Sequence, residues 1–331
     1  MKRGVLVVLT LLTSLFTKAQ WDSVGNGQPA TVNALIEYKG MLYAGGRSVL
    51  ACWDGQKWKS LGGIDGTVFA FAIYNNELYA GGAFDSIGTV EGNGLAKWDG
   101  SKWSVVDKDT KLGYVCALAV YNNELYAGGK FSNVSGMTHI GRWNGIKWQA
   151  VAKGVEDIWC LCVHNGILCM GGSIGYFALW NGTALIPAKD TYNHMADVEA
   201  LAVYSDKLFG GFLQPSNEDN LSSQAVWNNG AWNPSAQLVN GYTYALLSYN
   251  SMLYAGGAFD MAGKDKASCI AAWNGSNWTT LGKGISGQIP GTELAVKTLA
   301  VYNGYLYVGG TFSMAGGIPV HNIARYKLAG K

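Results

Sequence analysis

One short phrase, Leu-Tyr-Ala-Gly-Gly, recurs along the chain and constrains its fold more than any other feature. Complete or varied copies occur at residues 42–46, 78–82, 125–129, 168–172, 208–211, 253–257 and 306–310. The first glycines of neighbouring copies are 36 to 53 residues apart. Seven repeats of this size are typical of β-propellers, whose blades take about 40–50 residues each.

Each repeat contains four runs with the composition of β-strands. In the third repeat, the first run at residues 117–121 is apolar throughout, as expected for a strand buried on both faces. The tight turn Asn122-Asn123 leads to the Leu-Tyr-Ala-Gly-Gly run. A longer loop precedes a third run that ends in Trp143, and another tight turn opens a fourth run with Trp148. We therefore predict an all-β fold, a seven-bladed β-propeller of four-stranded blades.

The two ends of the chain are expected to complete one blade. The last repeat has its third run at residues 323–326 and no fourth run after it. Residues 21–25, Trp-Asp-Ser-Val-Gly, match the fourth run of the sixth repeat at 278–282. We expect the ring to close by pairing this N-terminal strand with the C-terminal blade, which removes two open sheet edges.

Residues 1–19 are predicted to be a secretory signal peptide. Lys2 and Arg3 precede a short apolar stretch at residues 4–16, and Thr17 and Ala19 are small residues suited to cleavage before Gln20. The apolar stretch is too short to span a bilayer comfortably. We expect a secreted or periplasmic protein whose residues 20–331 form the propeller; an uncleaved anchor is the alternative.

The charge balance argues against two classes of partner. The formal net charge is +2, and no run of Lys and Arg supplies the basic surface that nucleic acid or an anionic membrane needs. Only 14% of the residues are charged, against roughly 25% in an average soluble protein, as sheets buried on both faces would require. We expect no nucleic-acid partner, no membrane span in the mature chain, and a monomer.

The Gly-Gly pair that ends each second run, with the aromatic residue later in the repeat, resembles the kelch-type and galactose-oxidase-like propellers of secreted bacterial proteins. The resemblance covers nearly all of the mature chain. It implies the fold and leaves the activity open, because propellers host many unrelated functions. The Trp-Asp pairs at 53–54 and 98–99 are similar to those of WD40 repeats, but the Gly-His element of that family is missing.

Trp159 breaks the pattern of the other tryptophans. Twelve of the 13 occupy repeated places, where they are expected to pack between strands. Trp159 instead lies near the start of a first run, in a variable column close to the mouth of the expected channel. The equivalent residues of the other repeats are Asn33, Phe69, Cys116, Glu199, Tyr244 and Lys297. Trp159 either contacts a ligand or fills the channel.

The longer loops share one face of the expected propeller, opposite the tight turns. Long loops on a rigid scaffold commonly carry binding residues. The fourth and fifth repeats depart most from the common pattern. We predict a binding site there, formed by Trp159, Tyr176, Tyr192 and His194, for a protein partner or a surface glycan. The alternative is drift of the repeats without a function.

No catalytic or metal-binding set can be assembled from the sequence. The four histidines are scattered and do not form the cluster with tyrosine that copper would need, so we expect neither a metal nor another cofactor. The alternative to a binding module is a polysaccharide hydrolase or lyase, which needs two acid/base groups around one bond. The candidates on the long-loop face are Asp107, Asp109, Asp157, Asp197 and Glu199.

Six cysteines in a chain expected to be exported raise the question of disulfides. Cys162 would lie opposite Cys169 across the Asn165-Gly166 turn and could pair with it. The other interpretation is that the cysteines are small, buried thiols.

Overall fold

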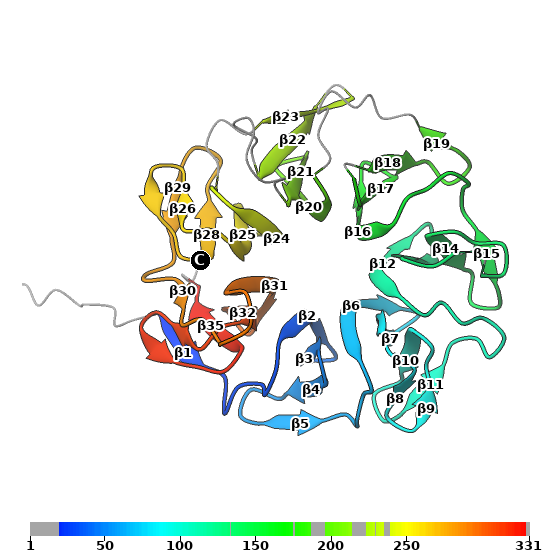
Figure 1. The fold of residues 1–331 in the computed structure, drawn as a ribbon, viewed down its shortest axis with the longest axis horizontal. Coiled ribbons are helices and arrows are strands. Elements are labelled where there is room, and N and C mark those ends of the chain that lie inside the picture. The colour runs from blue at the N-terminus through cyan, green and yellow to red at the C-terminus, as the bar shows by residue number, and fades with distance from the viewer. Residues whose placement is uncertain are drawn as a thin grey trace, which may run out of the picture.

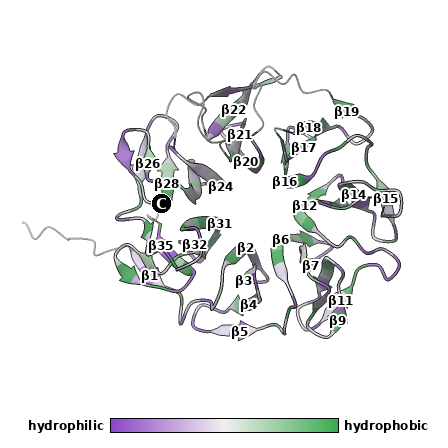
Figure 2. Ribbon diagram, viewed as in Figure 1, coloured by the Kyte–Doolittle hydropathy of each residue, from purple (hydrophilic) through white to green (hydrophobic). Residues whose placement is uncertain are grey.

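Seven four-stranded antiparallel sheets, the blades, stand in a ring around a common axis in the computed structural model (Figure 1). The structure describes residues 20–132, 134–174, 176–186, 196–213, 223–228, 230–234 and 239–328. The predicted all-β, seven-bladed propeller is therefore confirmed. Figure 2 shows hydrophobic residues on the innermost strands, for example on β12, β16 and β31.

The blades follow one another in chain order, and the strands of each are named from the innermost outward. Blade 1 contains β2 (Val32–Tyr38), β3 (Met41–Gly46), β4 (Val49–Trp53) and β5 (Trp58–Ser60). Blade 2 contains β6 (Thr67–Tyr74), β7 (Glu77–Ala83), β10 (Leu95–Trp98) and β11 (Trp103–Val105). Blade 3 contains β12 (Val115–Tyr121), β13 (Glu124–Gly129), β14 (Ile140–Trp143) and β15 (Trp148–Ala150). Blade 4 contains β16 (Ile158–His164), β17 (Ile167–Gly172), β18 (Phe177–Trp180) and β19 (Leu185–Ile186).

The remaining blades have the same order. Blade 5 contains β20 (Val198–Tyr204), β21 (Lys207–Phe212), β22 (Gln224–Asn228) and β23 (Ala231–Pro234). Blade 6 contains β24 (Tyr242–Tyr249), β25 (Met252–Ala258), β28 (Ile270–Trp273) and β29 (Trp278–Thr280). Blade 7 contains β31 (Ala295–Tyr302), β32 (Tyr305–Thr311), β35 (Ile323–Lys327) and β1 (Trp21–Ser23). Short extra strands in the longer loops are β8 (Ser86–Ile87), β9 (Val90–Glu91), β26 (Met261–Ala262), β27 (Asp265–Lys266), β30 (Ile285–Ser286), β33 (Met314–Ala315) and β34 (Ile318–Pro319).

The N-terminal strand closes the ring, as predicted. β1 pairs antiparallel with β35, and Trp21 lies opposite Tyr326. The backbone N–H of Lys327 extends this pairing by donating to the carbonyl of Gln20 over 2.7 Å. Farther along the chain, the Asn322 side-chain amide donates to the carbonyl of Gln28 over 3.0 Å. Blade 7 therefore combines β1 with three C-terminal strands. The backbone hydrogen bonds between β1 and β35 close the ring.

Tryptophan pairs hold the third and fourth strands of most blades together. Trp53 lies opposite Trp58 in the register of β4 and β5, and their ring centroids are 5.4 Å apart. The equivalent rings in blade 2, Trp98 and Trp103, are 5.3 Å apart. Aromatic pairs of this kind contribute about 0.5–1.5 kcal/mol beyond the area that they bury. The repeated tryptophans therefore pack within blades, as predicted.

Hydrogen bonds from the last residue of the innermost strand join neighbouring blades. The Tyr38 hydroxyl donates to the carbonyl of Asn76, in the tight turn of the next blade, over 2.8 Å. The Tyr302 hydroxyl likewise spans from blade 7 to the carbonyl of Gly40 in blade 1, also over 2.8 Å. In blade 4 the equivalent residue is His164, whose Nε2 lies 3.1 Å from the carbonyl oxygen of Asp206. These contacts fasten the ring on its tight-turn face.

All six cysteines lie at described positions and are free thiols. Cys162 is directly opposite Cys169 in the register of β16 and β17, so the predicted juxtaposition is present without a bond. Burial raises the pKa of Cys162 to about 11 and that of Cys169 to about 12. Cys162 and Cys169 are expected from the sequence to form either a disulfide or two buried thiols. The structure shows thiols, which pack in the core between blades 4 and 5.

Candidate functional site

Every innermost strand carries one β-bulge close to its first residue. In β16, Ile158 pairs with Gly172 and Cys160 pairs with Gly171, which leaves Trp159 without a partner in the strand register. A bulge disturbs the alternation of the strand and re-aims the unpaired side chain. The unpaired residues of the seven bulges are Asn33, Phe69, Cys116, Trp159, Glu199, Tyr244 and Lys297.

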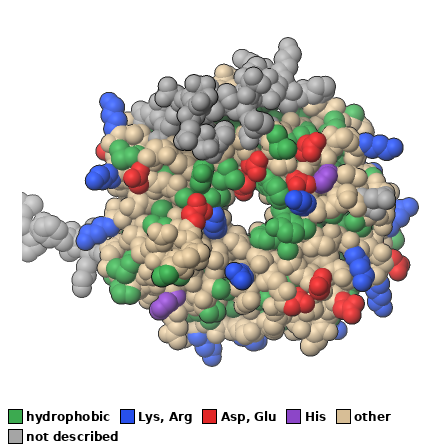
Figure 3. Space-filling model, in the orientation of Figure 1, with side chains coloured by type: hydrophobic (Ala, Val, Ile, Leu, Met, Phe, Trp, Pro, Cys, Tyr) green, Lys and Arg blue, Asp and Glu red, His purple; other side chains and the backbone are tan. Residues whose placement is uncertain are grey.

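These seven bulge residues line one cavity of about 340 Å³ at the end of the channel where the innermost strands begin, together with Tyr114 and Asp197. We call this cavity the channel mouth. Figure 3 shows hydrophobic, acidic and basic side chains gathered around the central opening of the ring. The variable column of the sequence therefore does lie at the mouth, and each blade contributes one member of it.

One part of the channel mouth is aromatic. Phe69 and Tyr114, from blades 2 and 3, have ring centroids 5.3 Å apart with their planes inclined by 30°. Tyr114 is 38% exposed, which is unusual for a large apolar side chain of this protein. Trp159 continues the wall in blade 4. Three neighbouring blades thus present ring systems to the cavity, which suits a ligand with an apolar or cationic surface.

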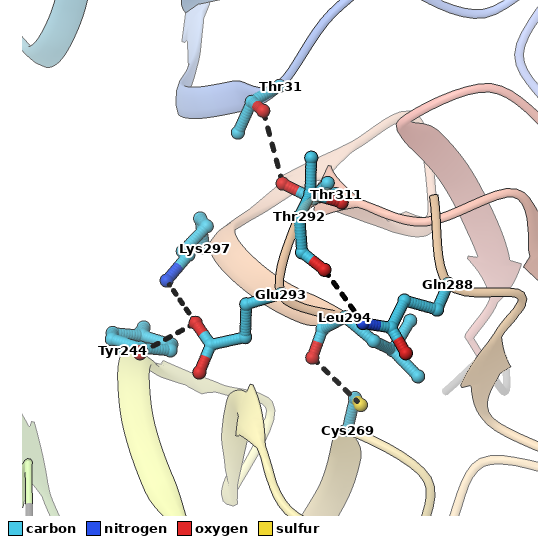
Figure 4. A network of polar contacts seen from close by, with 9 residues as sticks. All are labelled: Thr31, Tyr244, Cys269, Gln288, Thr292, Glu293, Leu294, Lys297 and Thr311. Atoms are coloured by element: carbon cyan, nitrogen blue, oxygen red, sulfur yellow. Dashed lines mark hydrogen bonds and ion pairs between the residues drawn. The ribbon is translucent and has the colours of Figure 1, made fainter. Parts of the chain in front are cut away.

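Lys297 and Tyr244 of the channel mouth contact each other and Glu293, which lies beside the cavity (Figure 4). The Lys297 ammonium lies 3.1 Å from Oε2 of Glu293, and the Tyr244 hydroxyl donates to the same oxygen over 2.8 Å. The Lys297 nitrogen also lies 3.1 Å from the centroid of the Tyr244 ring. Burial lowers the pKa of Lys297, although Glu293 opposes the shift. Burial, and then the hydrogen bond to Glu293, raise the pKa of Tyr244.

Two carboxyl groups of blade 5, Asp197 and Glu199, also line the cavity. Oδ1 of Asp197 accepts a hydrogen bond of 2.8 Å from the backbone N–H of Ile174 in blade 4. Glu199 has neither a hydrogen bond nor a salt bridge to any described residue. Burial raises the pKa of Glu199 to about 7; Asp197 adds to the shift and Lys297 opposes it.

The four predicted site residues have different outcomes. Trp159 lines the channel mouth. Tyr176 does not line it; the side chain is half-buried against the core between blades 3 and 4, and burial raises its pKa to about 12. Tyr192 and His194 lie outside the described residues. The grouping of all four at one site therefore stays a prediction, and Trp159 is the member with a place in a cavity.

The five candidate carboxylates are also separated by the structure. Asp107 lies in a surface loop, where it accepts a hydrogen bond from the backbone N–H of Asp109 over 3.0 Å. Oδ1 of Asp157 lies 2.8 Å from Nδ1 of His139. Of the five, Asp197 and Glu199 are brought together in the cavity.

Tyr114 and Glu293 are the members of this region that the sequence reasoning missed. Tyr114 lies two residues before the bulge residue Cys116, just as Asp197 lies two residues before Glu199. This shared offset is a usable signal for Tyr114. Glu293 lies four residues before Lys297, in the connection that precedes β31, and only the folded arrangement brings it to Tyr244 of the neighbouring blade.

The described residues contain no group of three or more His, Cys, Asp or Glu side chains placed to hold a metal ion. Nor do they include a helix whose length and hydrophobicity would allow it to cross a membrane.

No family model matches the chain, and no curated protein matches it by sequence. Among solved structures, it is similar to the WD40 β-propeller domain of Doa1, with a TM-score of 0.57 and 12% identity over 94% of this chain and 97% of that one. It is also similar to the computationally designed Ika8 protein, with a TM-score of 0.54 and 14% identity over 92% of this chain and 98% of that one. At these identities the likeness shows the β-propeller fold alone.

Proposed function

We propose that this chain is an exported, non-catalytic binding module that holds a protein partner or a surface glycan at the channel mouth. We also propose that it is related to the kelch-type and galactose-oxidase-like propellers and that residues 1–19 direct its export to the periplasm or the medium. A propeller commonly serves as a rigid binding scaffold, and long-range closure of the ring would keep such a site preorganised.

One observation carries the proposal: the seven bulge residues are of seven different types. They are Asn, Phe, Cys, Trp, Glu, Tyr and Lys, whereas the position before them is Val in five blades, with Ile158 and Thr243 in the other two. The position after them is Ala in five blades, with Cys160 and Thr298 in the others. A purely structural column would repeat itself as these flanking columns do. Different side chains at one mouth are what the recognition of an asymmetric ligand requires.

The experiment is a binding screen of residues 20–331 against polysaccharides and native envelope proteins, with Trp159→Ala as the test variant. Ile146→Ala is the control, because Ile146 is 83% exposed in an outer turn remote from the channel. We expect a ligand whose affinity falls at least tenfold with Trp159→Ala and is unchanged by Ile146→Ala. Full binding by Trp159→Ala would contradict the placement of the site.

A polysaccharide hydrolase or lyase is the second candidate, and one observation favours it. Asp197 and Glu199 line the same cavity, and a carboxyl with a pKa of about 7 is suited to act as a general acid. This candidate predicts release of reducing sugar that Glu199→Gln abolishes while binding persists. Binding without any release in the same screen would leave the non-catalytic proposal in place.

A further inference from the structure

The channel mouth has more negative than positive groups available to a ligand. Its lining includes Asp197, Glu199 and Lys297, and Lys297 is the sole cation among the described residues that line it. That cation already lies 3.1 Å from the carboxylate of Glu293, which lies beside the cavity. Lys297 also attracts Glu199, but its one positive charge is shared between Glu199 and Glu293, so the three carboxylates, when ionised, are only partly compensated by a cation among the described residues. A neutral ligand that displaced water from Asp197 and Glu199 would leave this excess negative charge uncompensated, whereas a cation would balance it.

Aromatic rings face the same space. Phe69, Tyr114, Trp159 and Tyr244 all line the cavity. The negative face of an aromatic ring attracts an ammonium or guanidinium group, and this attraction grows as the cation is desolvated. The mouth shows such a contact within the protein itself, because the Lys297 ammonium lies over the Tyr244 ring. Rings and carboxylates around one cavity are the usual chemistry for holding an organic cation.

The shape of the site limits how a ligand enters. The lining comes from all seven blades, so the cavity is surrounded on every side by the ring. A polymer backbone cannot pass sideways through such a ring, whereas a protruding side chain can enter along the axis. The cavity of about 340 Å³ is lined partly by aromatic rings, along which the aliphatic stem of a charged side chain can pack.

We propose that the channel mouth binds the ammonium group and aliphatic stem of a lysine side chain presented by a protein partner. This inference rests on the proposed binding function and specifies its ligand. Asp197 and Glu199 would balance the charge, and Trp159 and Tyr114 would pack along the stem.

The test is isothermal titration calorimetry of residues 20–331 at pH 8 with small probes. Nα-acetyl-lysine methylamide carries the proposed group, and Nα-acetyl-norleucine methylamide has a similar stem without the charge. Glucosamine and glucose test the amino-sugar and neutral-sugar alternatives. We expect the lysine probe to bind at least tenfold more tightly than the norleucine probe. We also expect it to bind at least tenfold more weakly to Glu199→Gln and to Asp197→Asn.

Glu91→Gln is the matched control, because it removes the same charge from an exposed position on the outer hairpin of blade 2. Circular dichroism melting establishes that each variant is folded. Equal binding of the lysine and norleucine probes, or preferential binding of either sugar, would overturn the lysine proposal. If the lysine probe fails while another ligand binds in a Trp159-dependent manner, the inference is wrong and the binding function stands. If no ligand depends on Trp159, both are wrong.

Discussion

Trp21 packs edge-on against Tyr326, with ring centroids 5.1 Å apart and planes inclined by 65°. The indole N–H of Trp21 also donates to the carbonyl of Leu281 over 2.7 Å. Leu281 follows the outermost strand of blade 6, so one side chain ties the N-terminal strand to both of the last two blades. In blade 7 this Trp–Tyr pair replaces the Trp–Trp pair of blades 1, 2, 3, 5 and 6.

Trp21→Ala should therefore destabilise the whole ring. The change removes a side chain that is 3% exposed, for which a loss of about 3–5 kcal/mol is expected. Trp21→Phe keeps most of the packing and removes the indole N–H, while the Leu281 carbonyl still accepts from the backbone N–H of Gly284 over 3.1 Å. The expected cost is therefore that of one hydrogen bond, about 0.5–1.5 kcal/mol. Urea unfolding followed by tryptophan fluorescence and by circular dichroism gives both values. A Trp21→Ala protein with the wild-type midpoint would show that the Trp21 side chain does not stabilise the closure.

Tyr302→Phe should weaken the contact between blades 7 and 1. It deletes the hydroxyl that donates to the carbonyl of Gly40, and a net loss of about 0.5–1.5 kcal/mol is expected. Tyr305→Phe is the matched control in the same blade, because the Tyr305 hydroxyl makes no hydrogen bond to a described residue. The two variants are compared by urea denaturation. Equal midpoints for both would indicate that water replaces the inter-blade bond without cost.

The repeat makes the fold predictable from the sequence. The cavity can be identified only once the three-dimensional arrangement of the blades is known. Each blade is built from hairpins that are local in sequence, so turns such as Asn165-Gly166 define strand order directly. The closure of the ring can also be predicted from the sequence, because the segments that begin at Trp21 and at Trp278 are similar. A bulge, in contrast, is a shift in register between two strands, and the residues around Trp159 do not reveal it. The sequence therefore identifies the variable column and its approximate position, but not its convergence on one cavity.

The rest of the candidate site is harder to predict because it depends on contacts between blades. Tyr176 belongs to an unusually short loop, which is why the sequence indicates it, yet its side chain packs against the core beside the channel. Glu293 gives no such signal, because its partner Tyr244 belongs to the preceding blade. The length of a loop can be read from the sequence and shows where the chain departs from its repeat. The direction in which a side chain points depends on contacts with the neighbouring blade, which the sequence does not show.

The cysteines should behave as unreactive thiols. Burial raises the pKa of Cys116 and Cys169 to about 12, so little reactive thiolate forms at pH 8. We expect the folded protein to react slowly with a thiol reagent and the urea-unfolded protein to titrate six thiols. Unfolding curves with and without dithiothreitol should coincide. Fewer than six reactive thiols after unfolding, together with a lower midpoint under reduction, would instead reveal a disulfide.

Glu199 should make stability fall as the pH rises. The carboxyl loses its proton near 4.5 in the unfolded chain but near 7 in the folded one, because burial and Asp197 disfavour the charge. Between these values the folded state holds more protons, so the free energy of unfolding decreases with increasing pH and then levels off. Tyr114, Cys116 and Tyr244 have raised pKa values and stay protonated over this range.

Glu199→Gln removes the titrating group and keeps the shape of the side chain. It should match the wild type at pH 4 and exceed it by about 1–3 kcal/mol at pH 8, as urea unfolding at both pH values would measure. Glu91→Gln, which lies outside the channel, should not reproduce this gain. A Glu199→Gln protein that is less stable than the wild type at pH 8 would mean that the ionised carboxylate is stabilised in the fold, through Lys297. The cavity would then lack the uncompensated charge on which cation binding depends.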